Sequence, residues 1–214
     1  FHHCLFFYIY YLFYIFPINK GDIKEMKNTV LIKNIKSKKG FSLLELLLVL
    51  GIIAALVVAA FIVYPKVQAS QRAQAESNNI ATIQAGVKAL YTSASSFDKL
   101  TTSVAVQAKI FPDNMLVGSG TAAKPVNAFK GDVIVESANT GPSAAQGSSF
   151  TITYKNVPAA ECTKIITAAA GNFYTAGVGT VGNVKPAGGV LDVAGTATQC
   201  QNGGNDNTLI FTSI

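Results

Sequence analysis

The sequence predicts an α+β fold in which a long N-terminal α-helix packs on a C-terminal head with an antiparallel β-sheet and a disulfide-closed region. Three observations predict this fold: an apolar segment at 41–64, an amphipathic segment after it, and short apolar runs that alternate with turn residues in the rest of the 214-residue chain. We expect four parts along the chain. They are an upstream segment (1–25), a basic leader (26–40), the long helix (41–92) and the head (93–214).

The upstream segment 1–25 is unlike the rest of the chain. Nine of its first sixteen residues are aromatic, and the first methionine is Met26. We interpret residues 1–25 as upstream translation that is not part of the working protein. The alternative is an additional membrane segment whose C-terminal end is held inside by Lys20 and Lys24. Residues 26–40 then form a short leader that contains lysine but no acid.

The apolar segment has the length of a membrane span. Nineteen consecutive residues from Leu46 to Tyr64 carry no charge. As a helix, 41–64 is roughly 36 Å long, which exceeds a hydrocarbon core of about 30 Å. The lysines before Gly40 place the N-terminus in the cytoplasm and the head outside. The alternatives are a buried core helix, for which the segment is long, and a cleaved secretory signal, which should be shorter and end at small residues.

The helix is expected to continue beyond the membrane. Pro65 should kink it, because a proline inside a helix removes a hydrogen bond and clashes with the preceding turn. Apolar residues then recur at helical spacing with polar residues between them, which is typical of a helix that buries one face. This predicted stripe consists of Ala69, Ala73, Ile80, Ile83, Val87, Leu90 and Tyr91.

The head should contain strands and one short helix. Residues 132–136, 149–155 and 208–212 are rich in β-branched and aromatic residues and are bounded by turn residues, which indicates strands. The segment from Pro158 to Gly171 is expected to form a helix, because proline suits a first helical turn and glycine a C-terminal exit.

Cys162 and Cys200 are the two cysteines after Gly40. Both lie on the side that we place outside the cytoplasm, where two cysteines are more often bridged than free. We therefore expect a disulfide. A metal pair is the alternative, but it lacks further ligands, because the two histidines are His2 and His3.

Composition favours some classes of function over others. After Gly40 the net charge is +1 of the total of +6, and the lysines are scattered singly. A phosphate-binding face needs clustered Lys and Arg, so we predict no specific nucleic-acid partner. The same part of the chain has no histidine and no arrangement of nucleophile, base and acid. We therefore expect neither an enzyme nor a cofactor or metal site. A solute-binding lipoprotein is also disfavoured, because it would need a lipid-carrying cysteine after the apolar segment, and no such cysteine is present there.

The stretch "KKGFSLLELLLVLGIIAAL" resembles the signature of type IV prepilins. The resemblance implies cleavage between Gly40 and Phe41 by a prepilin peptidase, N-methylation of Phe41, and an assembly role for Glu45 at the fifth position after the cut. In the head, "FPDNMLVGSG", "PVNAFKGDVIVES" and "SFTITYKNVPAAECTKIITAAAG" resemble the type IVb group, which includes bundle-forming and conjugative thin-pilus pilins.

What the resemblance implies is a structural filament subunit, namely a major pilin used for adhesion, aggregation or conjugative contact. Its partners would be further copies of itself in a helical homopolymer, the prepilin peptidase and the assembly platform of the inner membrane. The subunit would reside in the inner membrane with its head in the periplasm and would later form a surface pilus. A minor pilin and a type II secretion pseudopilin are the alternatives.

Elementary electrostatics gives Glu45 two interpretations. A carboxylate in an apolar layer costs a few kcal/mol unless it is paired. Cleavage before Phe41 would create an amine one helical turn away, in the same chain or in the next one. The alternative is an acid that stabilises the N-terminal end of the helix dipole.

Overall fold

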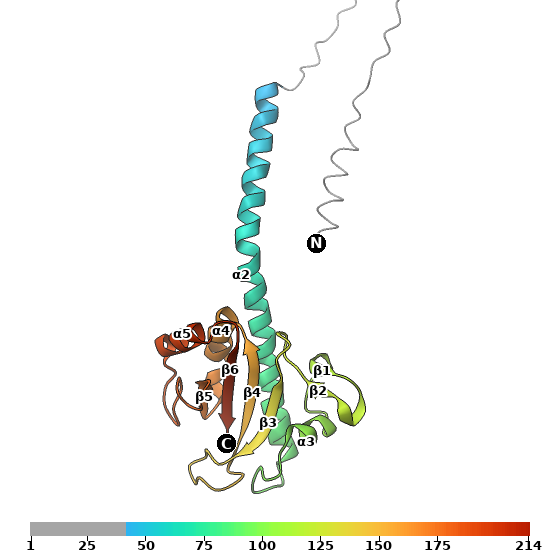
Figure 1. The fold of residues 1–214 in the computed structure, drawn as a ribbon, viewed down its shortest axis with the longest axis vertical. Helices are drawn as coiled ribbons and strands as arrows, with labels where there is room; N and C mark the ends of the chain where they lie inside the picture. Colours follow the sequence, from blue (N-terminus) through green and yellow to red (C-terminus); the bar gives the residue numbers. More distant parts are fainter. Residues whose placement is uncertain (1–41) are drawn as a thin grey trace, which may run out of the picture. The chain divides into compact units, whose positions relative to one another are not determined.

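The computed structural model describes residues 42–214 (Figure 1). Residues 47–214 form one compact unit, and residues 42–46 belong to a separate unit in which the first helix begins. The upstream segment 1–25, the leader 26–40, Gly40 itself and Phe41 lie outside the described residues, so the interpretations placed on them stay predictions.

The predicted long helix is confirmed as α2, which runs from Leu43 to Leu90 and contains 48 residues. Its length is roughly 72 Å at 1.5 Å per residue. Pro65 lies inside this helix, which continues on both sides of it. The kink that we predict at Pro65 therefore does not end the helix, and the kink itself stays a prediction.

The second half of α2 packs on the head through the predicted face. Ala73, Ile80, Ile83 and Val87 are buried. Leu90 was wrongly assigned to this stripe, because 46% of it is exposed where the helix ends. Ala69 and Tyr91 are half-buried.

Polar residues share the buried face of α2, which the apolar pattern did not reveal. They are Glu76, Ser77 and Gln84. Gln84 Nε2 donates to Asn172 O and to Ser213 Oγ, each at 2.9 Å. Because a buried amide needs hydrogen-bond partners, this side chain fixes the register of α2 against the end of the chain.

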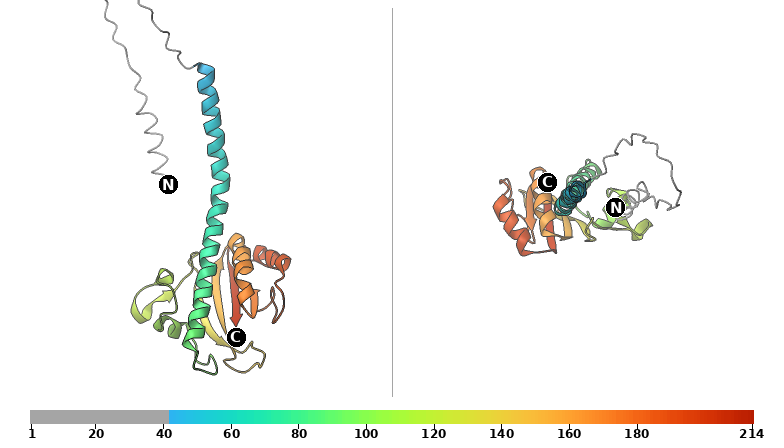
Figure 2. Two further views of the ribbon diagram at one scale, coloured as in Figure 1. Left: turned by 180° about the vertical axis from the view of Figure 1, so that it is seen from behind. Right: turned by 90° about the horizontal axis from the view of Figure 1, so that it is seen from above.

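The head is built on a four-stranded antiparallel sheet with the strand order β3-β4-β6-β5. The strands are β3 (Val133–Ala138), β4 (Ser149–Val157), β5 (Thr175–Val178) and β6 (Asn207–Ser213). Figure 2 shows α2 lying across one face of this sheet. The three predicted strands correspond to β3, β4 and β6, whereas β5 was not predicted.

The hydrophobic core lies between α2 and the sheet. Ile152 on β4 pairs with Val135 on β3 and with Phe211 on β6, and all three side chains are fully buried. Successive residues of a strand point to opposite faces, so alternate residues of each strand contribute to the same core. Ile80 and Ile83 of α2 belong to this core cluster.

Both edges of the sheet are partly covered. On β3, Val135 N donates to Thr102 Oγ1 at 3.0 Å, and Ser137 N donates to Leu100 O at 3.0 Å. At the other edge Ala176 of β5 exchanges backbone hydrogen bonds with Lys185. Exposed strand edges pair readily with other chains, and these contacts occupy part of each edge.

Smaller elements lie on the two sides of the sheet (Figure 1). Beside β3 are α3 (Thr102–Gln107) and the hairpin of β1 (Leu116–Val117) and β2 (Lys124–Pro125), with the 3-10 turns η1 (Asp113–Met115) and η2 (Gly120–Ala122). Beside β6 and β5 are α4 (Ala159–Ala169), the 3-10 turn η3 (Ala170–Asn172) and α5 (Val193–Asn202). Of these, the sequence predicted only α4.

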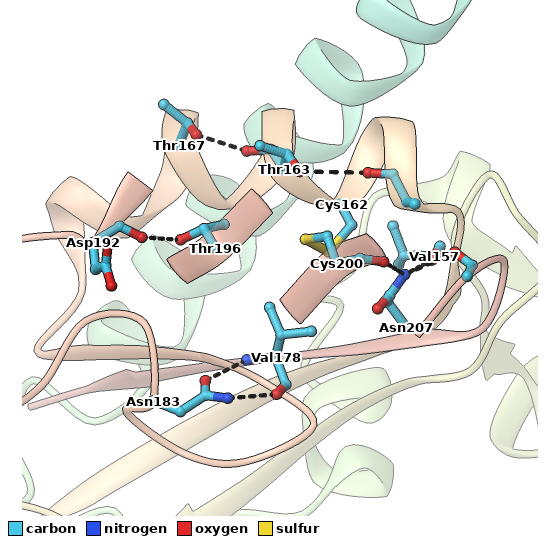
Figure 3. Close-up of a disulfide and its surroundings, with 12 residues drawn as sticks. Val157, Cys162, Thr163, Thr167, Val178, Asn183, Asp192, Thr196, Cys200 and Asn207 are labelled. Carbon is cyan, nitrogen blue, oxygen red and sulfur yellow. Dashed lines mark hydrogen bonds between the residues drawn. A yellow bond between two sulfur atoms is a disulfide. The ribbon is translucent and has the colours of Figure 1, made fainter. Parts of the chain in front are cut away.

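The predicted disulfide is confirmed and joins α4 to α5 (Figure 3). Cys162 and Cys200 have Cα atoms 5.8 Å apart, and both residues are fully buried. Asp192 caps α5 by accepting a hydrogen bond from Gly195 N at 2.9 Å. The segment that carries Cys200 forms a helix, although its valine, threonine and glycine residues are poor helix formers.

Asn207 fixes the chain between the disulfide and the last strand. Its Nδ2 donates to Val157 O at 3.1 Å and to Cys200 O at 2.9 Å (Figure 3). A third hydrogen bond goes to Gly204 O at 3.0 Å. This amide thus joins α5, the turn after it and the end of β4.

We expect loss of the disulfide to destabilise the head by about 2–5 kcal/mol, the usual range for small secreted domains. The change is Cys200→Ser, compared with the Cys162→Ser Cys200→Ser double variant. Chemical unfolding of the full chain in detergent under oxidising conditions measures the effect. Both variants should match the reduced wild type. Unfolding free energies equal to that of the oxidised wild type would contradict a stabilising role.

Candidate assembly interface

The first half of α2 exposes a long apolar surface. Of the helices in the described part of the chain, only α2 has the length and composition to cross a membrane, and none of its apolar window is buried. The exposed large side chains begin at Leu43, of which 76% is exposed, and continue to Val67. Soluble monomers rarely expose an apolar patch of this extent. This surface therefore requires lipid or other protein to cover it.

The composition of this surface suits helix packing. Gly51, Ala54, Ala55, Ala59 and Ala60 interrupt the large side chains. No heavy atom lies within 4 Å of a Cβ placed on Gly51. Small residues let helix backbones approach closely where the hydrophobic effect no longer drives association, as in a membrane. The same surface can therefore exchange lipid for neighbouring helices.

Glu45 lies in the first turn of α2 and is exposed. Glu45 N and Leu46 N donate to Ser42 O at 2.9 and 3.1 Å, which are the first backbone hydrogen bonds of the helix. Ser42 and Glu45 have the spacing of a capping box, in which a Ser or Thr is followed three residues later by Glu or Gln. Glu45 is thus suited to helix initiation as well as to pairing with an amine. Because Phe41 is not described, the predicted charge pair is untested.

Glu76 anchors α2 to the head. Only 3% of this residue is exposed. Its Oε1 accepts a hydrogen bond from Ala128 N at 2.9 Å, and its Oε2 accepts one from Asn79 Nδ2 at 3.4 Å. Burial raises the pKa of the Glu76 carboxyl, and the hydrogen bonds from Ala128, Asn79 and Tyr154 oppose that rise.

Tyr154 of β4 lies behind this carboxylate in the core. Its hydroxyl oxygen is 4.0 Å from Met115 Sδ. Burial first, and then the charge of Glu76, raise the pKa of Tyr154 well above its usual value, so the phenol stays protonated and can donate. Glu76 therefore links three segments, namely α2, the loop at Ala128 and β4.

A further contact joins α2 to the disulfide-closed region. Lys164 Nζ on α4 donates to Ser70 Oγ on α2 at 2.7 Å. Exposed contacts of this kind contribute little stability. The hydrogen bond shows that α4 lies beside α2 at the point where the exposed apolar surface of α2 ends and its buried face begins.

The predicted special residues are not gathered into one site. Cys162 and Cys200 lie in the head, Pro65 and Glu45 lie on the exposed half of α2, and Gly40 is not described. Among residues 42–214, no group of three His, Cys, Asp or Glu side chains could hold a metal ion. The candidate interface is therefore a surface, formed by α2 and the head at its base.

Comparison with known proteins agrees with this architecture. Residues 35–61 match the family model of the prokaryotic N-terminal methylation motif, and residues 70–214 match the PilS N-terminal family model. A long helix that begins in a methylation motif and packs on an antiparallel head defines the class of type IV pilins. Because the second match covers more than half of the chain, the protein belongs to the PilS family of type IV pilins.

One solved structure, a type IVb pilin, shows a similar fold. The type IVb pilin from Salmonella typhi is 18% identical, with a TM-score of 0.50 over 64% of this chain and 97% of that one. TcpA, a type IV pilin from Vibrio cholerae El Tor biotype, is 14% identical, with a TM-score of 0.44 over 69% of this chain and 99% of that one. No curated protein gives a significant match.

Because the pKa of Glu76 is raised, its contribution to the stability of the head should depend on pH. The folded protein holds this proton more tightly than the unfolded chain, so its contribution to stability is full below the ordinary carboxyl pKa of 4.5 and is lost as pH rises through the folded value. Glu76→Gln keeps an oxygen that can accept from Ala128 N but cannot ionise. We expect this variant to gain stability relative to the wild type as pH rises from 4 to 8.

The measurement is the difference in unfolding free energy between the two proteins in detergent at each pH, because other titrating groups cancel in that difference. Glu136→Gln, at an exposed strand position, is the control, because it removes a carboxylate of the same kind. A constant difference between Glu76→Gln and the wild type would contradict the assignment.

Proposed function

We propose that this chain is the major subunit of a type IV pilus and polymerises through the exposed half of α2. The observation that carries the proposal is the apolar surface between Leu43 and Val67, which none of the described residues 42–214 covers. Lipid would cover it before assembly, and helices of other copies would cover it in the filament. A minor pilin or a type II secretion pseudopilin is the second candidate, and abundance in sheared filaments distinguishes a major subunit from a minor one.

Processing and location follow from the same proposal. A prepilin peptidase would cut between Gly40 and Phe41 on the cytoplasmic side, and Phe41 would then be N-methylated. The methylation-motif match at 35–61 supports a processed N-terminus. Lysines before Gly40 favour a cytoplasmic N-terminus, with the head in the periplasm until the assembly platform of the inner membrane adds the subunit to a surface pilus. Adhesion, cell aggregation or conjugative contact would be its use.

The head supports assembly through a helix in preference to strand addition. A donated strand needs a free sheet edge. Here Thr102 Oγ1 accepts a hydrogen bond from Val135 N on one edge, and the backbone of Lys185 pairs with that of Ala176 on the other. Helices therefore offer the larger uncovered surface.

Glu45 tests the proposal, because pairing and capping make different demands on this residue. In a capping box Gln can serve in place of Glu, whereas a charge pair with the Phe41 amine needs the carboxylate. We expect both Glu45→Gln and Glu45→Ala to leave normal amounts of pilin in the membrane that begins at Phe41, with few or no filaments. Immunoblotting, N-terminal sequencing and electron microscopy measure the three quantities.

Comparing filament formation by the two variants distinguishes the pairing role of Glu45 from its capping role. Filaments from Glu45→Gln but not from Glu45→Ala would assign the residue to capping and refute the charge pair. Abundant filaments from both variants would refute any assembly role. Filament protein that still carries residues before Phe41 would refute the proposed processing.

A further inference from the structure

An open cleft lies in the head beside α2, close to where the apolar surface ends. It has a volume of about 460 Å³, and its walls include Arg72 of α2, Lys130 of the β2–β3 loop, and Asp206 before β6. Arg72 follows Val67, the last large apolar residue of the exposed half, by about one and a half helical turns. The cleft therefore adjoins the surface that we assign to assembly.

The cleft carries positive charge that no other described residue neutralises by direct contact. Arg72 and Lys130 are exposed, and Asp206 is the one acid among the residues that line the cleft. None of these three side chains has a hydrogen-bond or ion-pair partner within the described residues 42–214. Two cations beside one acid leave a net charge of about +1, which favours an anionic group as the occupant.

The loop that carries Lys130 is held rigidly. Asn127 Oδ1 accepts hydrogen bonds from Phe129 N and Gly131 N, each at 2.9 Å, and Asn127 Nδ2 donates to Lys155 O at 2.7 Å. Gly131 leaves no room for a Cβ against Lys155 O. Lys130 itself has a φ of 64°, in the left-handed region that non-glycine residues rarely adopt.

The other walls of the cleft are equally fixed. Glu76 binds Ala128 N from α2, and Asn207 holds the turn that contains Asp206 through Gly204 O. An occupant would therefore meet cationic side chains that are carried on a fixed backbone, which lowers part of the entropic cost of binding.

We propose that this cleft receives an exposed carboxylate from a second copy of the chain in the filament, so that Arg72 and Lys130 set the register between neighbouring subunits. The inference rests on the proposed function. Helices of neighbouring copies that pack in a filament lie 8–10 Å apart and would bring the head of another copy against this cleft. A helical polymer joins two different patches of the same subunit, so the acid must lie elsewhere on the head. The exposed acids of the head outside the cleft are Asp98, Asp113, Asp132, Glu136 and Asp192.

Carbodiimide cross-linking of assembled filaments tests the proposal, because it joins a lysine amine to a carboxylate with which it is in contact. Filaments grown from a mixture of ¹⁴N- and ¹⁵N-labelled pilin distinguish links between copies from links within one copy. We expect Lys130 peptides of one label to be joined to an acidic peptide of the other. Lys130→Arg should keep its filaments and lose the link.

Charge reversal supplies the second arm. Arg72→Glu combined with Lys130→Glu should reduce filament number about tenfold or more, while membrane pilin and the unfolding free energy of the head stay unchanged. Lys99→Glu is the matched control, because Lys99 is also an exposed lysine with positive φ, at 61°. Reversing the cross-linked acid to lysine should restore filaments to the double variant.

Filaments that show Lys130 links within single copies only, or normal filament numbers from the double variant, would overturn the docking inference and leave the proposed function standing. A link from Lys130 to a different protein would overturn it as well. Failure of the wild type to form any filament would instead refute the proposed function, and this inference with it.

Discussion

One helix has to satisfy two environments, and the rest of the structure depends on that constraint. From Ala73 to Val87, α2 completes the core of the head. From Leu43 to Val67, its apolar side chains remain exposed. Burial of apolar surface stabilises by roughly 25 cal/mol per Å², so the exposed half is driven toward lipid or other helices. The head must therefore fold stably while half of its own helix stays available to partners.

The head meets this demand by fixing α2 with polar contacts as well as apolar ones. Gln84 binds Ser213 near the C-terminal end of β6, and Glu76 binds the loop at Ala128. Apolar packing alone specifies position loosely, whereas buried hydrogen bonds fail if the helix slides or rotates. These contacts keep the helix in one register against the sheet while its other half remains exposed.

The architecture also limits association through the sheet. Thr102 and Lys185 occupy backbone groups at the two edges, and the disulfide holds α4 and α5 together beside β6. Subunits concentrated in a membrane would otherwise meet through unpaired strands. These contacts leave fewer strand groups free for association, whereas the first half of α2 stays exposed.

The sequence predicted the parts of the fold that have strong local patterns. The uncharged run up to Tyr64 and the β-branched segments of β3, β4 and β6 are such patterns. The prediction missed β5, which is only four residues long. This strand contains Gly177, and glycine is required there because a Cβ would clash with Thr180 O. The prediction also missed α5, where Asp192 as the capping residue and Gly203 after the last turn were the available signals.

The candidate interface could be predicted only in part. The apolar half of α2 and Glu45 are visible in the sequence because length and an isolated acid are local features. The cleft at Arg72 and Lys130 was not visible, because its walls come from residues more than fifty positions apart along the chain. The buried role of Glu76 was missed for the same reason: its partner Ala128 lies 52 residues away.

Electron cryo-microscopy of sheared filaments would show whether the exposed half of α2 becomes the interior of a polymer. We expect helices from many copies to be packed in the centre, with residues between Leu43 and Val67 in contact with each other and the heads outside. A filament whose subunits meet only through their heads, with this half of α2 on the outer surface, would contradict this expectation.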